Sequence, residues 1–135
     1  MLAIDGKIAL VTGATRGIGK AIALQLASQG AIVIGTATSE AGAQSITASL
    51  SAVGNAGTGM VLNVADCESV SGTLKAIVEA YGAPAILVNN AGITRDNLLM
   101  RMSDDQWDDV LNINLKGSFT CIRSVIKHMM KKWLY

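Results

Sequence analysis

Hydrophobic residues follow two patterns along the 135-residue chain. Short continuous apolar runs, typical of buried strands, alternate with longer stretches in which apolar residues recur every three or four positions, as in helices. The runs predict strands over residues 8–11, 31–35, 60–64 and 85–90. The periodic stretches predict helices over residues 17–29, 40–53, 67–81 and 104–132.

The order of these elements predicts the fold class. Strands that lack an apolar–polar alternation are typical of a parallel sheet that helices cover on both faces. Strands that alternate with helices through short connections favour a doubly wound α/β sheet, and right-handed crossovers then give the strand order 3-2-1-4. Because the chain has no repeat, low-complexity tract or linker, we expect one domain over residues 1–135.

Charge and composition exclude several classes of function. Lysine and arginine number 11 against 10 acidic residues, so no excess of one sign indicates nucleic acid or an anionic membrane as the main partner. No apolar run is long enough to span a membrane, and the first residues lack the pattern of a signal peptide. Cys67 and Cys121 stand in no metal-binding or redox spacing. We therefore expect a soluble, cytoplasmic protein with reduced cysteines and no metal centre.

Three glycines follow the first predicted strand, in the turn that leads into the first helix: Gly13, Gly17 and Gly19. Glycine lets the chain turn tightly, and the missing side chain lets backbone N–H groups approach a ligand. The N-terminus of a helix attracts anions such as a pyrophosphate. Strand, glycine turn and helix in this order predict a dinucleotide-binding site; the alternative is a turn with a purely structural role.

The end of the second predicted strand indicates which dinucleotide binds. Enzymes that use NAD usually carry an acidic residue there, which binds the ribose 2′-hydroxyl. Residues 36–39 read Thr-Ala-Thr-Ser, and the first carboxylate is Glu40. Arg16, inside the glycine turn, can reach a 2′-phosphate with a charge-assisted hydrogen bond worth about 1.5–3 kcal/mol. We predict NADP(H) as cofactor; the alternative is that Arg16 is merely solvated.

These motifs together resemble the short-chain dehydrogenase/reductase family. The resemblance lies in the Gly-x-x-x-Gly-x-Gly turn after Thr12, in Asn63-Val64 after the third strand, and in Asn-Asn-Ala-Gly at residues 89–92. Within the family, residues 7–14, 35–40 and 89–102 are similar to the bacterial reductases of 3-oxoacyl-acyl-carrier-protein. The similarity extends from about residue 5 to residue 132.

This resemblance implies a fold, a reaction and a set of site residues. It implies the N-terminal part of a Rossmann-like domain, hydride transfer from NADPH to a β-ketoacyl thioester on acyl carrier protein in fatty acid biosynthesis, and a homotetramer. It places the phosphates along the glycine turn, the adenosine phosphate end at Thr38, the adenine at residues 63–64, and the ribose near Asn90. The implied cofactor-binding residues are Gly13, Ala14, Thr15, Arg16, Gly17, Ile18, Gly19, Thr38, Asn63, Val64, Asn90, Ala91 and Gly92.

Asn114 is the candidate for a catalytic position. It follows Trp107, Val110 and Leu111 at helical spacing, which predicts an amide on the apolar face of a helix. A buried amide is costly unless it is hydrogen-bonded, so one interpretation is a structural bond to a nearby carbonyl. The other interpretation, which the resemblance implies, is that Asn114 holds a position in the proton relay.

Two charged groups in the last predicted helix favour structural roles. Residues 104–109 hold four aspartates, but Ser103 followed by Gln106 is typical of a capping box, and acids in a first turn complement the helix dipole. We therefore predict that these residues cap the helix and do not bind a metal. His128 lies among lysines at the other end of the helix, which we interpret as a solvated basic terminus. An acidic carrier protein could contact it, but a basic C-terminal turn needs no partner.

The groups that would complete the reaction are missing. Reduction of a ketone needs a proton donor, for which the family uses tyrosine with a lysine four residues later, and a serine. Neither Tyr81 nor Tyr135 is followed by such a lysine. Because the family continues beyond residue 132 with another strand, we hypothesise a frameshifted or prematurely stopped coding sequence, which the nucleotide sequence past codon 135 would test.

A truncated domain has physical consequences. The fourth strand becomes an exposed edge, and we expect Ile122, Val125, Ile126 and Met129 to face water. We predict a chain that is inactive by itself. The alternatives are a non-catalytic dinucleotide-binding or interaction module and a non-functional gene product.

Overall fold

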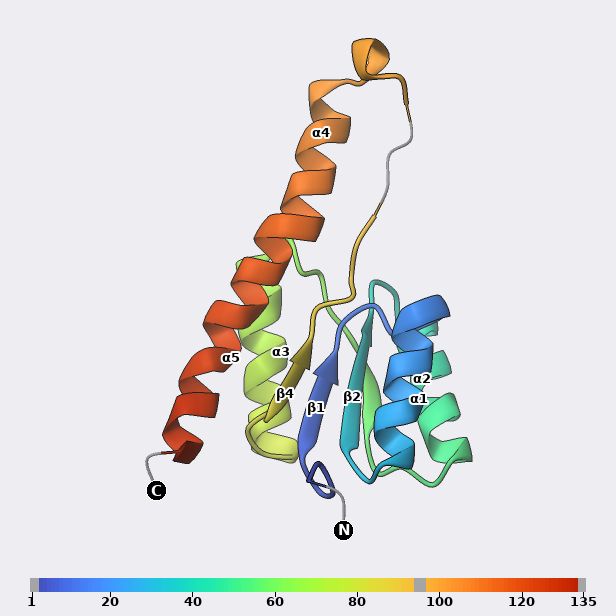
Figure 1. Ribbon diagram of the computed structural model, residues 1–135, viewed down its shortest axis with the longest axis vertical. Coiled ribbons are helices and arrows are strands. Elements are labelled where there is room, and N and C mark those ends of the chain that lie inside the picture. Colours follow the sequence, from blue (N-terminus) through green and yellow to red (C-terminus); the bar gives the residue numbers. More distant parts are fainter. Residues whose placement is uncertain (1–2, 94–96, 134–135) are drawn as a thin grey trace.

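The computed structural model describes residues 3–93 and 97–133 and contains a parallel sheet with helices on both faces (Figure 1). The strands are β1 (Ile8–Val11), β2 (Ile32–Ala37), β3 (Thr58–Val61) and β4 (Ile86–Val88). The helices are α1 (Gly17–Ser28), α2 (Glu40–Ala52), α3 (Cys67–Ala80), α4 (Asp104–Val110) and α5 (Gly117–Trp133). A 3₁₀ turn, η1 (Leu99–Arg101), precedes α4, and a π-helical segment, η2 (Leu111–Lys116), joins α4 to α5. Residues 94–96 of the family resemblance and 134–135 of the frameshift hypothesis lie outside the described residues.

The strand order is β3-β2-β1-β4 with every pair parallel, which confirms the predicted order and the doubly wound α/β class. The predicted boundaries of three strands were wrong. The third strand runs over Thr58–Val61 rather than over residues 60–64. The second strand continues to Ala37, because Thr36 and Ala37 still pair with Met60 and Val61 of β3. The fourth strand ends at Val88 rather than at residue 90.

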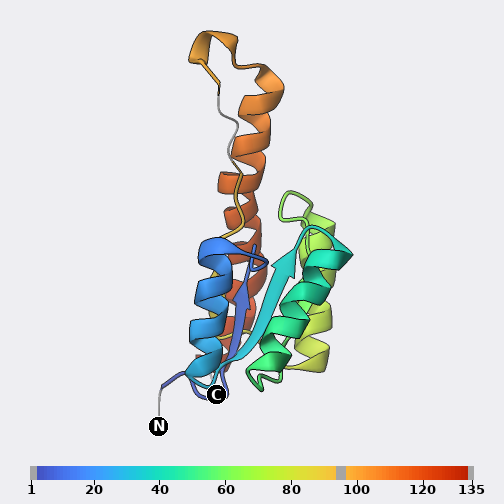
Figure 2. The same cartoon turned by 90° about the vertical axis from the view of Figure 1, so that its right-hand side faces the viewer.

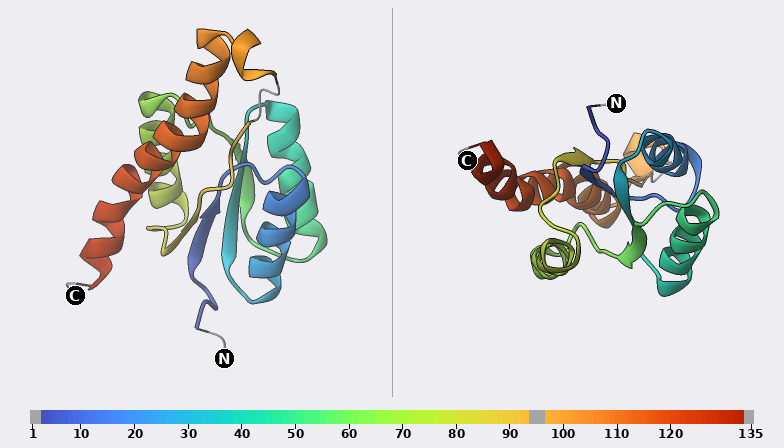
Figure 3. Two further views of the ribbon diagram at one scale, coloured as in Figure 1. Left: turned by 45° about the horizontal axis from the view of Figure 1, so that its top comes forward. Right: turned by 90° about the horizontal axis from the view of Figure 1, so that it is seen from below.

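Side chains alternate between two cores, one on each face of the sheet. On one face, Ala9, Val11 and Val33 pack against α1 and α2. On the other, Ile8 and Leu10 pack against α3 and α5, where their partners include Leu74, Ile77 and Val125. Figure 3 shows the two helix pairs on opposite sides of the sheet.

Burial is uneven across the sheet. The central strand β1 is buried along its whole length, whereas β3 and β4 are mostly half-buried. The expectation that continuous apolar runs mark strands buried on both faces was therefore wrong for these two. Both lie at an edge of the sheet, where one side of the strand lacks a neighbouring strand.

Capping side chains explain where three helices begin. Ser39 caps α2, and Asp66 caps α3 by accepting a hydrogen bond from the N–H of Glu68. Ser103 and Gln106 form the predicted capping box of α4. By contrast, Arg16 at the N-cap of α1 makes no side-chain capping bond. The first turn of α1 therefore stays available to a ligand.

The last helical region projects beyond the carboxyl ends of the strands, as Figures 1 and 2 show. One continuous helix was predicted, but η2 interrupts it with π-helical geometry. The expectation that four of its apolar residues face water was wrong for Val125, which is buried, and for Met129, which packs against the core. Ile122 and Ile126 are exposed. Within residues 3–93 and 97–133, no helix is long and apolar enough to cross a membrane.

Candidate cofactor site

A cleft of about 510 Å³ lies at the carboxyl ends of the strands. The glycine turn, the ends of β2 and β3, and the segment after β4 form its walls. Open parallel sheets bind ligands at this edge, where neighbouring connections diverge to opposite faces. The residues that line it are Gly13, Thr15, Arg16, Gly17, Ile18, Thr36, Ala37, Thr38, Leu62, Asn63, Val64, Asn90, Ala91, Gly92, Ile93 and Ile113.

The cleft brings together most of the residues named from the sequence. Two of the thirteen do not line it. Ala14 is buried, and its N–H donates a hydrogen bond to the Thr36 carbonyl oxygen at 2.9 Å. Gly19 lies beneath the turn, against Gly13 and the Asn90 amide. The lining residues that the motifs did not indicate are Thr36, Ala37, Leu62, Ile93 and Ile113.

The glycines of the turn act in two different ways. Gly13 and Gly17 have φ angles of 65° and 59°, a backbone conformation that side chains disfavour. Gly19 has an ordinary helical φ, but a Cβ there would collide with the Gly13 carbonyl oxygen and the Asn90 amide nitrogen. The turn thus needs glycine for backbone conformation at two positions and for close packing at the third.

Thr12 joins the glycine turn to the segment after β4. Its hydroxyl oxygen accepts hydrogen bonds from the backbone N–H groups of Asn90 and Ala91, at 3.1 and 3.0 Å. These two N–H groups bond to a side chain rather than to a strand, which explains why β4 ends at Val88. No role of its own was predicted for Thr12 from the sequence. This role could have been predicted from the position of Thr12, a hydroxyl residue directly after a buried apolar strand.

Asn90 has a structural contact that the motif did not reveal. Its side-chain amide donates to the carbonyl oxygen of Gly13 at 2.9 Å, so it holds the glycine turn in place. The residue also lines the cleft, where the sequence analysis placed it beside a ribose.

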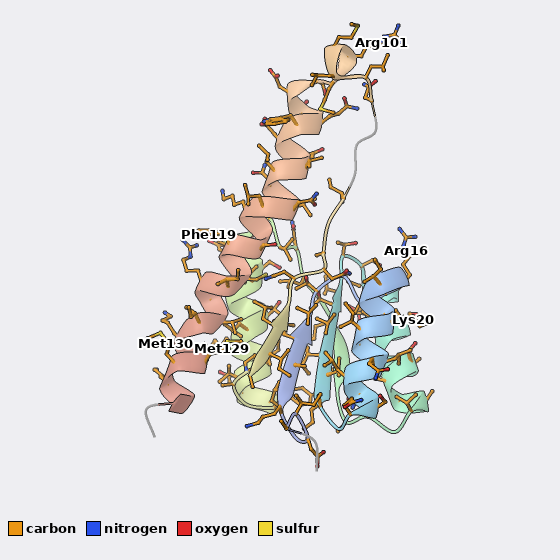
Figure 4. All side chains as sticks on the ribbon, viewed as in Figure 1. Arg16, Lys20, Arg101, Phe119, Met129 and Met130 are labelled. Atoms are coloured by element: carbon orange, nitrogen blue, oxygen red, sulfur yellow. The ribbon has the colours of Figure 1, made fainter. Side chains whose placement is uncertain are left out.

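The start of α1 faces the cleft through Gly17 and Ile18. With no side-chain cap, and no acidic residue in its first turn, the positive end of the helix dipole is not neutralised locally. Arg16 is exposed and extends from this end of the helix (Figure 4). The arrangement suits a phosphate-bearing ligand.

The opposite end of the cleft is formed by Thr38, Asn63 and Val64, beyond β2 and β3. None of the described residues that line the cleft is acidic. Glu40, the first carboxylate after β2, stands in the first turn of α2 and is exposed. The Ser39 hydroxyl is already used, because it accepts the Gly42 N–H at 3.1 Å.

The predicted burial of Asn114 was wrong. Asn114 lies in η2, and its side chain is exposed because the apolar face on which the helical spacing placed it is itself exposed, as Trp107 and Leu111 show. Its amide oxygen accepts the Ile93 N–H at 2.8 Å, and its amide nitrogen donates to the Ile93 carbonyl oxygen at 2.9 Å. Asn114 therefore fixes Ile93, a residue of the cleft wall, without lining the cleft itself.

The cysteines and the potential metal ligands outside the cleft were also considered for a role. Among the described residues, no three His, Cys, Asp or Glu side chains group closely enough to hold a metal ion. Both cysteines are free; Cys67 is exposed and Cys121 is buried. Burial raises the pKa of the Cys121 thiol.

Comparison with known proteins identifies the family to which the chain is similar. Residues 7–133 match the short chain dehydrogenase model. The chain is 57% identical over 129 residues to a 3-oxoacyl-(acyl-carrier-protein) reductase, FabG, of Vibrio cholerae, covering 96% of this chain and 52% of the relative. The protein of the same name from Pseudomonas aeruginosa is 54% identical over 133 residues, or 98% of this chain and 54% of the relative.

A third relative of that name, from Staphylococcus epidermidis, is 46% identical over 127 residues, or 93% of this chain and 52% of the relative. The chain thus spans about half the length of the curated relatives it matches. The family model covers nearly the whole chain, and the parallel sheet with its glycine turn agrees with the match. The chain belongs to the short-chain dehydrogenase family.

Proposed function

We propose that this chain is the NADPH-binding half of a short-chain reductase that acts on 3-oxoacyl groups carried by acyl carrier protein in the cytoplasm. The observation that carries the proposal is the cleft itself, where an uncapped helix N-terminus and a glycine turn meet at the carboxyl edge of a parallel sheet. The names of the relatives supply the substrate class.

The residues of the turn fit a dinucleotide pyrophosphate. A Cβ at Gly13 would lie 2.9 Å from the Cα of Ala91, so the wall of the cleft tolerates no side chain there. The backbone N–H groups at the start of α1 lack a side-chain acceptor, and a pyrophosphate would satisfy them. When bound, the cofactor would supply the hydride for the reduction.

The charges of the residues around the cleft favour NADP over NAD as the cofactor. The end of β2 offers Thr38 and no carboxylate to the cleft, so nothing there repels a 2′-phosphate. Arg16 lines the same cleft and is exposed, free to extend toward such a group. A charge-assisted hydrogen bond from this guanidinium would favour the phosphorylated cofactor by about 1.5–3 kcal/mol.

The chain holds Asn114 but not the proton donor that reduction of a ketone requires. No tyrosine is followed by a lysine four residues later. Through its two hydrogen bonds to Ile93, Asn114 would keep the wall of the cleft in place beside the bound cofactor. We therefore propose that the chain binds NADPH and does not turn over substrate by itself.

Titration of the purified chain with NADPH and with NADH tests this proposal. We expect NADPH to bind more tightly, and Arg16→Met to weaken NADPH binding about tenfold or more while NADH binding stays unchanged. Lys20→Met is the matched control, since Lys20 is exposed on the same helix and does not line the cleft.

An assay of acetoacetyl thioester reduction, run in parallel, separates the alternatives. NADPH binding without turnover of the thioester supports the proposal. The chain would then act as a non-catalytic binding module. Loss of both binding and turnover would indicate a non-functional product. Robust turnover would overturn the proposal that the chain is inactive because it lacks the tyrosine proton donor.

A further inference from the structure

A groove of about 370 Å³ lies between α3 and α5, the two helices that pack together on one face of the sheet. Figures 1 and 3 show these helices as neighbours, on the face away from α1 and α2. The groove shares no lining residue with the cofactor cleft. Its volume lies at the lower end of the range typical of small-molecule sites, about 300–1,000 Å³. The groove is therefore a second place where a small ligand fits.

Hydroxyl groups lie on both walls of this groove, because α3 and α5 run in the same direction. The sulfur of Cys67 in α3 lies 3.9 Å from the hydroxyl oxygen of Thr120 in α5, at an offset of 53 positions. The same offset relates Ser71 to Ser124, and both line the groove. Neither serine hydroxyl has a hydrogen-bond partner within residues 3–93 and 97–133. Two hydroxyl donors are thus available to a ligand.

Positive charge lines the groove one helical turn further along. Lys75 lines it from α3, and Lys127 and His128 line it from α5. In the part of the chain that the structure describes, the two ammonium groups form no ion pair and the His128 ring has no hydrogen-bond partner. Like charges around one groove repel each other when no counter-charge separates them. An anion bound between them would remove that repulsion.

Glu79 is the one acidic side chain among the described residues that line the groove, and it follows Lys75 by one turn of α3. It forms no ion pair with either lysine in the described part of the chain. The two lysines outweigh this single carboxylate, so the lining is positive on balance. Repulsion from Glu79 would move a bound anion toward the serine hydroxyls, at the other end of the groove.

The floor of the groove is aliphatic, with Leu74 buried and Val78 half-buried. The methylene stems of Lys75 and Lys127 add apolar surface beside it. A bare inorganic anion would leave this surface unused, whereas an anion with an alkyl group would cover it. The lining therefore fits a ligand with one charged end and one apolar end.

The number of donors indicates which anion fits. Five donor side chains line the groove: Ser71, Lys75, Ser124, Lys127 and His128. A carboxylate offers about four acceptor positions on two oxygens. A phosphate monoester offers three terminal oxygens and a charge of about −1.5 to −2 near neutral pH. The phosphate matches both the number of donors and the excess of positive charge.

We propose that the groove between α3 and α5 binds a short aliphatic phosphate monoester. The phosphate lies among the serine hydroxyls and the cationic side chains, and the alkyl group lies along Leu74 and Val78. Because this ligand contacts both helices, it stabilises the packing of α5 beside α3. The inference does not depend on the cofactor proposal.

Calorimetric titration of the full chain with n-hexyl phosphate tests the proposal. We expect saturable binding, and Lys127→Gln should raise the dissociation constant about threefold to tenfold. The matched control is Lys131→Gln, which removes the same charge one turn later on α5, outside the groove, and should leave the constant unchanged. Glu79→Gln should lower the constant about twofold or more, because it removes the repelling carboxylate. Far-UV circular dichroism verifies that all three variants fold.

Other ligands and one further variant test the ligand class and the location. Inorganic phosphate lacks the alkyl group and hexanoate lacks the third oxygen, so each should bind more weakly than hexyl phosphate. Equal affinity for either one overturns the proposed ligand class. Arg16→Met should leave hexyl phosphate binding unchanged, and weaker binding in that variant would place the ligand in the cofactor cleft instead. Absence of saturable binding, or equal effects of Lys127→Gln and Lys131→Gln, overturns the proposed site.

Discussion

The hydroxyl oxygen of Thr12 accepts the backbone N–H of Asn90 at 3.1 Å, across 78 positions of sequence. The same oxygen accepts the N–H of Ala91, and Thr12 is 1% exposed. One buried hydroxyl thus ties the glycine turn after β1 to the segment after β4. Both walls of the cofactor cleft depend on this contact.

Replacing Thr12 with valine should loosen that connection. Thr12→Val keeps the shape of the side chain but leaves two N–H groups without their acceptor, each at a cost of about 1–3 kcal/mol when buried. We expect the free energy of unfolding to fall by about 2–4 kcal/mol in urea denaturation. Thr12→Ser, which keeps the hydroxyl, should retain most of the stability. Equal losses in the two variants would show that the methyl group matters more than the hydrogen bonds.

Two glycines offer a matched test of close packing. Gly19→Ala places a methyl group against the Gly13 carbonyl oxygen and the Asn90 amide, and we expect it to destabilise the fold by about 1–3 kcal/mol. Gly72→Ala is the control, because its Cβ in α3 would meet no atom within 4 Å. That change should stabilise the chain by about 0.5–1 kcal/mol, since alanine is the better helix former. Thermal unfolding measures both, and a Gly19→Ala variant as stable as wild type would contradict the packing argument.

The apolar pattern predicts the sheet and its order because the relevant information is local. A continuous apolar run such as residues 8–11 has few ways to be buried except as a central parallel strand. Strand ends were predicted less well, because pairing partners decide them. Thr36 and Ala37 remain in β2 through Met60 and Val61 of β3, and the residues themselves carry no sign of that.

The residues of the candidate cofactor cleft were likewise predictable only in part. The glycine turn is a local motif, so Gly13 and Gly17 could be named from the sequence. Thr12 and Ile93 take their roles from partners far along the chain, namely Asn90 and Asn114. The π-helical geometry around Asn114 could not be read from a pattern that assumes a constant helical period.

Asn114 should control the mobility of the cleft wall. Asn114→Ala removes both hydrogen bonds to Ile93, each worth about 0.5–1.5 kcal/mol. We expect amide hydrogen exchange at Ile93 to become about tenfold faster or more, with little change in the core amides of β1. Asn114→Asp, which keeps the acceptor for the Ile93 N–H and loses the donor, should have a smaller effect. Unchanged protection at Ile93 in Asn114→Ala would show that the wall is held by other contacts.

The two cysteines should differ sharply in reactivity. Thiols react as thiolates, and burial both shields the Cys121 sulfur and raises the pKa of its thiol. We expect a thiol reagent to label Cys67 in the native chain and Cys121 after unfolding. Mass spectrometry of the labelled peptides distinguishes them, and rapid native labelling of Cys121 would mean that α5 detaches from the sheet.

The raised pKa of Cys121 also predicts how stability depends on pH. Above the ordinary thiol pKa, the unfolded chain releases a proton that the folded chain still holds, so unfolding becomes more favourable as pH rises. The stabilising contribution is therefore complete below the ordinary thiol pKa and is lost as pH rises through the raised value. Urea denaturation from about pH 7 to pH 10 should show a steeper loss for wild type than for Cys121→Ala, which lacks the titrating group. Parallel pH profiles would mean that Cys121 has the same proton affinity in both states.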